Sequence, residues 1–309
     1  MMRLFSRRLF TAAFAIVGAA TLVFLMLRLV PGDPAELILG DRAQAQDLMQ
    51  FRAQHCLDRP LWAQYGCFWS DILDGSLGHS MTRPGHTVFT LIAENAPPSV
   101  ELALAAMALA IAVAWPLGLI AALRPQGAID LMISAVSVLG ITIPNFWLGN
   151  LLLIVFAISL DWLPVSGETT GLLNLVLPAM TLGLALAAKQ SQMLRTSVIE
   201  VRTEPWVTAV RARGISESRL LFTYVLPLAI IPVVTVVGMQ LGAILVGTVI
   251  TEEVFARPGL GSLLLEGVHR RDFAIVQGCV LLISFVYVCV NLLTDLVYLA
   301  LDPRVRREA

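Results

Sequence analysis

The chain has 309 residues, of which 57% are hydrophobic and 14% are charged, and its formal net charge is −1. Soluble domains usually carry about 25% charged residues, so this composition excludes an ordinary soluble domain and indicates a membrane protein. The single lysine, Lys189, follows an alanine, which excludes the Gly-Lys-Ser/Thr loop that holds ATP phosphates. If ATP drives this protein, another chain must bind it.

Six segments are long and apolar enough to cross a bilayer, which takes about 20 residues at 1.5 Å each. The predicted spans are residues 9–30, 99–123, 131–159, 175–197, 228–250 and 276–301. The first resembles a signal peptide because arginines precede it, but its apolar run is long and no convincing cleavage site follows, so we expect an uncleaved span. Pro116 and Pro144 are expected to kink the second and third spans.

The arginines are unevenly distributed between the two sides of the membrane that six spans define. One side holds Arg3, Arg7, Arg8, Arg124, Arg195, Arg202, Arg211, Arg213, Arg219, Arg304, Arg306 and Arg307. The opposite loops hold fewer arginines, and acids outnumber them there. Since basic residues favour cytoplasmic loops, we predict that both chain termini are cytoplasmic.

Residues 31–98 form the longest predicted outer segment, and their mixed composition predicts a small folded lobe. Cys56 and Cys67 lie in this lobe, where an oxidising compartment would allow a disulfide, although the sequence leaves the pairing open. The loop histidines match no spacing that is typical of a metal site, so no metal site is predicted. Residues 251–275 form another outer loop, with a turn at Arg257-Pro258-Gly259 and a short helix after it.

Residues 203–227 form a polar insert between the fourth and fifth spans. Pro205 suits the first turn of a helix, where its missing N–H costs nothing, and Gly214 suits a left-handed C-terminal stop. We therefore predict a helix over residues 205–213. An insert of this kind is not needed to cross the membrane, so it is interpreted either as a docking surface for a soluble partner or as an amphipathic loop on the lipid surface.

Helical periodicity places Trp206, Ala209 and Val210 on one face of that helix. A second short helix is predicted from about residue 216, and Pro227 is expected to break it before the fifth span begins.

Polar residues inside the spans are functional candidates, because such residues are costly in lipid. The candidates for a translocation path or gate are Asn145, Lys189, Gln190, Gln192 and Gln240. Lys189 is expected either to face the path or to pair with Asp295. Arg28 and Asp295 lie near the ends of their spans and are expected to reach water with their charged groups.

The polar insert resembles the EAA motif of bacterial ABC importer permeases. That motif is a triplet of small residues, then Gly after three residues, then a hydrophobic-x-Leu-Pro ending nine residues later. Here the triplet is Thr208-Ala209-Val210, the glycine is Gly214, and the ending is Tyr224-Val225-Leu226-Pro227. The departures from the motif are Thr208, Val210 and Tyr224, and the spacing agrees throughout.

Further motifs along the whole chain resemble the dipeptide, oligopeptide and nickel branch of that family. They are Val30–Pro34, Gly75–Ser80, Ile143–Trp147, Trp162–Gly167, Leu177–Ala179, Glu253–Phe255, Pro258–Gly261, Arg271-Asp272, Asn291–Leu293 and Asp302–Arg304. Each of these is weak by itself, but their joint order and spacing are specific.

The resemblance implies an all-α type I ABC importer permease with six transmembrane helices in a bacterial inner membrane. The implied segments are 1–30 with the first helix, the lobe 31–98, the core 99–301 with the coupling segment 203–227, and the tail 302–309. It also implies a second homologous permease, two ATP-binding subunits that hold ATP and Mg, and an external substrate-binding protein. No cofactor is expected in this chain, no enzymatic activity and no nucleic acid.

The same resemblance implies two sets of contact residues. The ATPase-coupling residues would be Trp206, Thr208, Ala209, Val210, Arg211, Arg213, Gly214, Leu226 and Pro227. The contacts with the binding protein would be Asp33, Glu253, Arg257, Gly259, Arg271 and Asp272.

The expected substrates are dipeptides or oligopeptides, while nickel, metal chelates, glutathione and opine-like conjugates stay open. A secondary transporter is the rival class, but it would be expected to show charged relays or broken helices at mid-membrane. Few charges lie inside the predicted spans. A membrane-embedded enzyme is also disfavoured, because the spans contain no paired acids.

Overall fold

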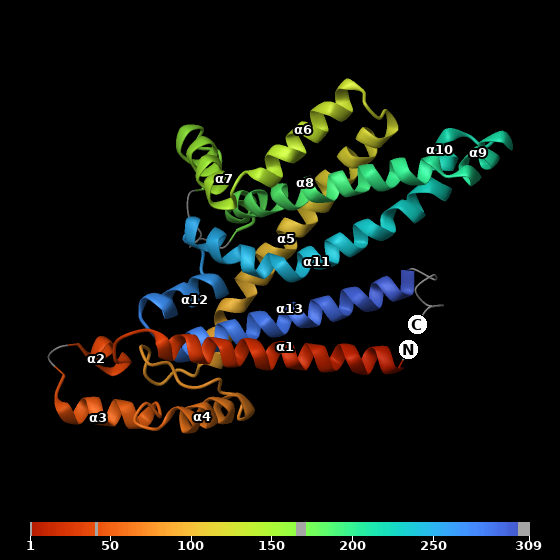
Figure 1. The fold of residues 1–309 in the computed structure, drawn as a ribbon. Coiled ribbons are helices and arrows are strands. Elements are labelled where there is room, and N and C mark those ends of the chain that lie inside the picture. Colours follow the sequence, from red (N-terminus) through yellow and green to blue (C-terminus); the bar gives the residue numbers. More distant parts are fainter. Residues whose placement is uncertain (1, 41–42, 165–170, 302–309) are drawn as a thin grey trace. The chain divides into compact units, whose positions relative to one another are not determined.

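Every regular element in the described part of the chain is a helix (Figure 1). The computed structural model describes residues 2–40, 43–164 and 171–301. The predicted tail, residues 302–309, and the end of the Trp162–Gly167 motif lie outside the described residues. The all-α class predicted from the sequence is confirmed.

The long helices are α1 (Met2–Leu29), α5 (Val88–Leu123), α8 (Leu173–Thr203), α11 (Leu226–Val254) and α13 (Phe273–Leu301). The shorter elements are α2 (Pro34–Leu39), α3 (Ala45–Gln54), α4 (Leu61–Leu73), α6 (Ala128–Thr142), α7 (Asn145–Leu152), η1 (Leu153–Ser159), α9 (Pro205–Ala212), α10 (Glu217–Arg219), η2 (Leu220–Val225) and α12 (Leu260–His269). Among the described residues, five helices can cross a membrane by length and composition, or six segments if one bent pair counts as a single span.

The bent pair is the predicted third span. The segments 128–142 and 145–159 meet at an angle of 106°. Ile143 is extended, as the residue before a proline usually is, and Pro144 then begins α7. The predicted kink at Pro144 is confirmed, and it is a full break that divides the segment into two helices.

The second span is longer than predicted. α5 begins at Val88, eleven residues before the predicted start at 99, and continues through Pro97 and Pro98. It also runs through Pro116 to its end at Leu123, so Pro116 does not end the helix. The sequence prediction stopped at the two prolines because proline usually marks a helix boundary.

The contacts divide the chain into two units, which we describe separately. The core unit comprises Glu101–Phe255 and the chain from Cys289 onward, and the lobe unit comprises Met2–Val100 and Ala256–Val288. The lobe unit therefore contains α1 and α12 as well as the predicted lobe 31–98. α1 belongs there because its Phe24 is buried against Phe68 of α4.

α8 is the central helix of the core unit. It runs beside α11 and α6 and also contacts α7 (Figure 1). Small residues let α5 approach α8 closely: a Cβ on Gly183 would lie 2.9 Å from the Ala106 carbonyl, and one on Gly118 would lie 2.7 Å from the Ser191 carbonyl. Because a Cβ at either position would displace the backbone of the facing helix, these glycines set the separation of the two helices.

Apolar side chains in the lobe unit pack between α5, α12 and α13. The cluster contains Val88, Leu91, Ile92, Leu260, Leu263, Ile275 and Cys279. The Ser99 hydroxyl accepts a hydrogen bond from the Leu260 backbone N–H at 2.8 Å, which fixes the start of α12 against α5.

Candidate functional site

The helix predicted over residues 205–213 is present as α9. Pro205 occupies its first turn, and Arg213 follows its last residue. Gly214 has a φ of +77°, the left-handed conformation that stops a helix, and its N–H donates to the Arg211 carbonyl at 3.0 Å. The predicted helix and its glycine stop are confirmed to within one residue.

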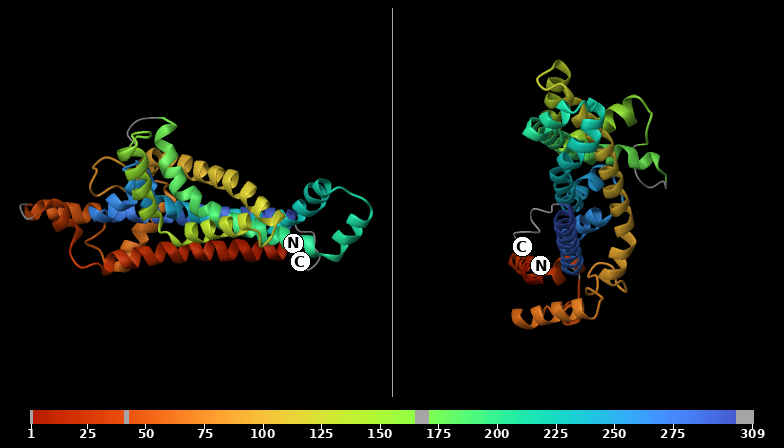
Figure 2. Two further views of the ribbon diagram at one scale, coloured as in Figure 1. Left: turned by 90° about the horizontal axis from the view of Figure 1, so that it is seen from above. Right: turned by 90° about the vertical axis from the view of Figure 1, so that its right-hand side faces the viewer.

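The inner face of α9 is anchored where α8 ends and α11 begins (Figure 2). Val207 is fully buried, and Trp206 and Val210 pack against the same apolar cluster. Leu194 and Val198 contribute to this cluster from α8, together with buried residues of η2. The inner face of α9 is therefore packed directly against the helices of the core unit.

Ala209 does not share this buried face, which corrects the sequence prediction. Val207 and Val210 are three residues apart and point inward, so the residues between them point outward. The exposed surface, which we call the docking face, consists of Thr208, Ala209, Arg211, Arg213 and Gly214.

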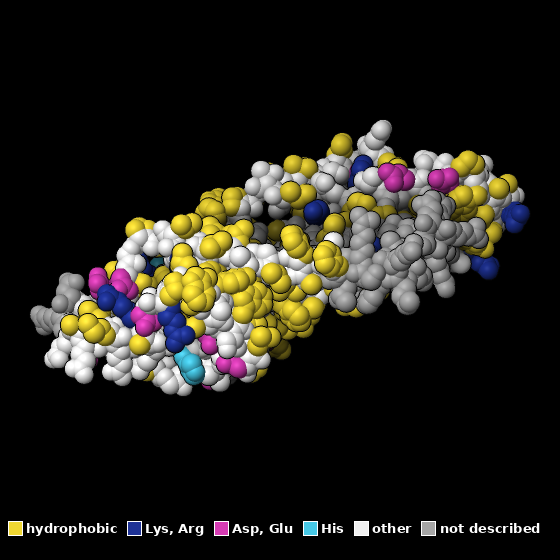
Figure 3. Space-filling model, turned by 60° about the horizontal axis from the view of Figure 1, so that its bottom comes forward, with side chains coloured by type: hydrophobic (Ala, Val, Ile, Leu, Met, Phe, Trp, Pro, Cys, Tyr) yellow, Lys and Arg dark blue, Asp and Glu magenta, His cyan; other side chains and the backbone are white. Residues whose placement is uncertain are grey.

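The charges beside the docking face are organised around Glu217. Its carboxylate accepts hydrogen bonds from Arg211 at 2.5 and 3.3 Å and lies 3.7 Å from Arg202. The Arg211 and Glu217 side chains are 46% and 59% exposed, so water screens this pair and it contributes little to stability. Charged side chains gather at this end of the core unit on the face that Figure 3 shows.

The helix before Pro227 does not end as predicted. α10 passes into the π-helix η2, and α11 begins at Leu226 with Pro227 in its first turn. Leu226 is half-buried and Pro227 is exposed. A proline lacks the N–H donor and crowds the preceding turn. A π turn is wider than an α turn, so the chain accommodates the ring without a break.

Two of the candidate path residues are hydrogen-bonded to each other inside the core unit. Gln190 of α8 is fully buried and donates to the Gln240 side chain of α11 at 2.7 Å. Gln240 in turn donates to the Leu186 carbonyl at 3.3 Å. These two amides therefore join α8 to α11 and do not line an open surface of this chain, which corrects the expectation that they face a path.

The other candidate path residues are accessible. Lys189 is exposed on α8, and Gln192 and Asn145 are half-buried. Within the described ranges, Lys189 has no ion-pair partner, so the expected pair with Asp295 is absent.

Asp272 is a buried acid of the lobe unit with several hydrogen-bond partners. It is fully buried, and one carboxylate oxygen accepts hydrogen bonds from the Ser80 hydroxyl at 2.6 Å and from the backbone and hydroxyl of Thr82 at 2.9 Å. The other oxygen accepts from the Ile275 N–H at 3.2 Å. A buried carboxylate with these partners holds the loop of residues 80–82 in place. The expectation that Asp272 itself contacts a binding protein is therefore wrong.

Two more of the expected contacts have internal roles. Asp33 caps α2 through the Ala35 N–H and accepts from Arg52 at 2.7 Å. Arg271 donates to the Pro31 carbonyl at 2.9 Å.

Two residues in the turn before α12 are buried. Arg257 is 8% exposed, and Gly259 is buried at the start of α12. Glu253 at the end of α11 is exposed and stays available to a partner.

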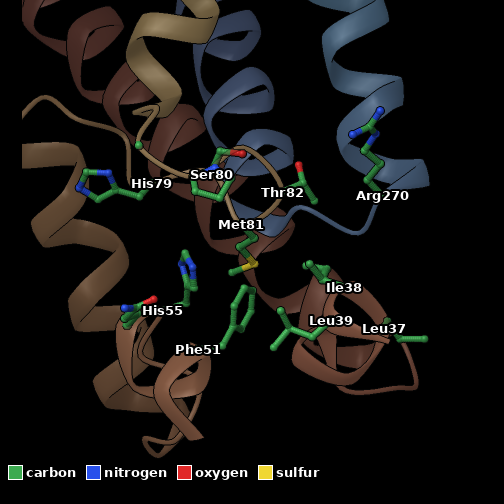
Figure 4. Close-up of a pocket in the computed structure, with 13 residues that line it drawn as sticks. Leu37, Ile38, Leu39, Phe51, His55, His79, Ser80, Met81, Thr82 and Arg270 are labelled. Atoms are coloured by element: carbon green, nitrogen blue, oxygen red, sulfur yellow. The ribbon is translucent and has the colours of Figure 1, made fainter. Parts of the chain in front are cut away.

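A cavity of about 910 Å³ opens in the lobe unit (Figure 4). Its lining combines apolar and basic side chains: Leu37, Ile38, Leu39, Phe51, Gln54, His55, His79, Ser80, Met81, Thr82, Pro84, Gly85 and Arg270. Figure 4 shows the Met81 side chain pointing toward Phe51. Burial lowers the pKa of His55, which stacks on Phe51, and nearby His79 lowers it further against the opposing effect of Asp272.

The disulfide that the sequence left open is present. Cys56 and Cys67 are bonded, with their Cα atoms 6.8 Å apart. The bond connects the end of α3 to the middle of α4 and closes a short loop.

Asp130 is a site that the sequence analysis did not single out. It is 1% exposed at the start of α6 and accepts hydrogen bonds from two guanidinium nitrogens of Arg195 on α8, one of them at 2.7 Å. It also accepts from the Gln126 N–H at 2.8 Å. The sequence feature that could have indicated this pair is an acid and an arginine at the ends of two predicted spans, but only the fold shows that the two residues meet.

Two family models match this chain. The one described as "Binding-protein-dependent transport system inner membrane component" matches residues 114–307, and the corresponding N-terminal model matches residues 1–100. The chain is 35% identical to the di/tripeptide transport system permease protein DppB of Pseudomonas aeruginosa, over the full length of both. It is 38% identical to the glutathione transport system permease protein GsiC of Pectobacterium atrosepticum, over 99% of each chain.

The fold is also similar to a solved structure, an inward-facing conformation of the MetNI methionine ABC transporter. The TM-score is 0.58 at 16% sequence identity, and the match covers 70% of this chain and 98% of that chain. At this level of identity the likeness concerns the fold alone.

Proposed function

We propose that this chain, which belongs to the family of binding-protein-dependent transport system inner membrane components, is the permease subunit through which an ATP-driven importer moves short peptides. Relatives named as a di/tripeptide permease and a probable peptide permease support this substrate class. Glutathione is the second candidate, because permeases named for it are 38% identical to this chain. Glutathione is itself a peptide, so both candidates have a free C-terminal carboxylate.

The observation that carries the proposal is the docking face of α9. It is exposed, while the opposite face of the same helix is buried against α8 and η2. An ATP-binding subunit that moves α9 would therefore move the helices of the core unit with it. Such a rigid element suits alternating access, in which the spans exchange an inward-facing for an outward-facing state.

The proposed complex contains a second permease, two ATP-binding subunits that hold ATP and Mg, and an external binding protein. The distribution of arginines supports cytoplasmic termini and a cytoplasmic α9. The lobe of residues 31–98 would then face the binding protein. Exposed Glu253 would be one of its contacts.

Crosslinking tests the docking face. We expect an Ala209→Cys variant, made in a Cys289→Ser background, to crosslink to cysteines placed in the groove of the ATP-binding subunit. Val207→Cys is the matched control, because Val207 lies on the same helix but is fully buried. If Ala209→Cys forms no crosslink at several groove positions and is labelled from the lipid phase, α9 lies on the membrane surface.

Peptide transport is tested separately. The complex, purified with its partner subunits and reconstituted in lipid, should hydrolyse ATP faster when its binding protein carries a mixture of dipeptides. Stimulation by glutathione alone would move the substrate to the second candidate. Lack of stimulation by both would contradict the peptide proposal.

A further inference from the structure

α8 carries a polar stripe on its exposed face. Lys189 and Thr196 are exposed, and Gln192 between them is half-buried. Spacings of three and four residues place these side chains on one side of a helix. The adjacent Gln190 and Leu194 point the other way and are buried in the core unit. A lipid-facing surface would be apolar instead; the exposed Leu131 and Met132 of α6, at 64% and 63%, are side chains of that kind.

Lys189 lies deep within the span. It is fourteen residues from the start of the predicted span at 175 and eight from its end at 197, which correspond to about 21 and 12 Å at 1.5 Å per residue. Arg195, six residues later, forms the ion pair with Asp130. The Cα–Cβ bonds of a helix tilt toward its N-terminus, which for Lys189 is the direction away from Arg195.

An ammonium at this depth must have water or an opposite charge beside it. No described residue forms an ion pair with Lys189. The Asp130 carboxylate, which lies beside α8, is already paired with Arg195. Water can reach this exposed side chain in an open path, and any opposite charge beside it would come from outside the described part of this chain.

We propose that Lys189 binds the carboxylate of the transported peptide in the translocation path. This inference rests on the proposed peptide function. Peptide carboxylates have a pKa of about 3.3 to 3.7 and are ionised at neutral pH, so they supply such an opposite charge. The lysine ammonium is a compact charge with three hydrogen-bond donors, and it lacks the planar two-pronged geometry with which an arginine guanidinium holds a carboxylate. Contact through one such group favours the transient binding that permeation requires.

Charge restoration at this position tests the proposal. The Lys189→Cys variant is made in a Cys279→Ser, Cys289→Ser background and reconstituted with its partner subunits. Uptake of alanylalanine should fall by roughly tenfold to a hundredfold, the usual worth of a hydrogen bond to a charged group. Aminoethyl methanethiosulfonate adds an ammonium to the thiol and should restore uptake, whereas the sulfonatoethyl reagent adds an anion and should not.

The binding of the carboxylate is tested without transport. Millimolar alanylalanine should slow the labelling of Lys189→Cys by a water-soluble maleimide in the nucleotide-free complex, whereas its C-terminal amide should not. Val246→Cys on α11 is the control, because Val246 is 59% exposed and apolar, and its labelling should not respond to either compound.

The outcomes separate this inference from the proposed function. If the parent complex takes up no peptide, the proposed function fails. If the parent complex transports and Lys189→Cys transports equally well, or is rescued equally by both reagents, Lys189 does not bind the carboxylate. Equal protection by the acid and the amide would also overturn the assignment. Loss of co-purification with the second permease would show that Lys189 pairs with that subunit instead.

Discussion

Replacement of Gly214 by valine should uncouple ATP hydrolysis from transport. Gly214 has a φ of +77°, and a Cβ added to it would meet nothing within 4 Å. The substitution therefore adds no clash with neighbouring residues, and its effect comes from the backbone alone. Valine disfavours the left-handed conformation, so the chain after α9 would leave it and the docking face would lose its defined end.

The cost of a left-handed conformation is roughly 1 to 2 kcal/mol for an ordinary residue and higher for a β-branched one. A free-energy difference of about 1.4 kcal/mol changes a population ratio tenfold at room temperature. Most molecules of Gly214→Val would therefore hold the turn in another conformation. Gly214→Asn should show a smaller defect, because asparagine tolerates positive φ.

Gly75 provides a matched control. It follows the helix α4 as Gly214 follows α9, with a φ of +80° and open space around its Cβ position. The preceding residues have nearly the same backbone: Asp74 has φ −79° and ψ −7°, and Arg213 has φ −81° and ψ 7°. Gly75→Val thus introduces the same strain in the lobe unit, in a turn that contributes no residue to the docking face.

The assay is the ratio of peptide imported to ATP hydrolysed in proteoliposomes, with membrane insertion and co-purification of the ATP-binding subunit as controls. Gly214→Val should insert normally and lower this ratio several-fold, whereas Gly75→Val should leave it near that of the parent protein. The reasoning is refuted if Gly214→Val couples normally, or if Gly75→Val lowers the ratio equally.

Other contacts lead to three further predictions. Replacing Cys56 and Cys67 by serine should lower the free energy of unfolding by about 3 kcal/mol, the entropic worth of a short closed loop, and thermal unfolding should show it. Burial lowers the pKa of His55, so the unfolded state binds the proton more readily and stability is lost as pH falls below about 6.5. The melting temperature of His55→Gln should therefore fall less than that of the parent protein between neutral and mildly acidic pH. An equal fall in both proteins would contradict the assignment. Asp130→Asn should lower stability by up to about 3 kcal/mol, because Arg195 keeps its charge without a counter-ion, and an unchanged melting temperature would show that water replaces the carboxylate.

The backbone preferences of individual residues predicted the bounds of α9 well. The first turn at Pro205 and the stop at Gly214 each depend on one residue and its backbone preference, which a sequence shows directly. The same reasoning failed at Pro227, because a π turn absorbed the proline. Whether the chain forms a π turn at this point depends on how η2 packs, and the residues near Pro227 alone do not predict it.

Contacts between segments that are distant along the chain could not be predicted from the sequence. Asp130 and Arg195 are 65 residues apart, and Gln190 and Gln240 are 50 apart. The sequence indicated that polar groups lay in or beside the spans, and their cost in lipid made them candidates for the path. Whether such a group faces water or another buried amide depends on helix rotation, which periodicity alone fixes poorly in segments that are apolar all round.

The buried hydrogen bond of the two glutamines also explains how α8 and α11 act together. α9 is anchored on the cluster that contains the end of α8 and the turn leading into α11. Farther along the same two helices, Gln190 and Gln240 connect them, next to Lys189 on the exposed side of α8. Separating this pair would leave buried amides without partners, at a cost of about 1 to 3 kcal/mol for each group. A displacement at the docking face is therefore expected to move α8 and α11 as one element, and to carry Lys189 with it.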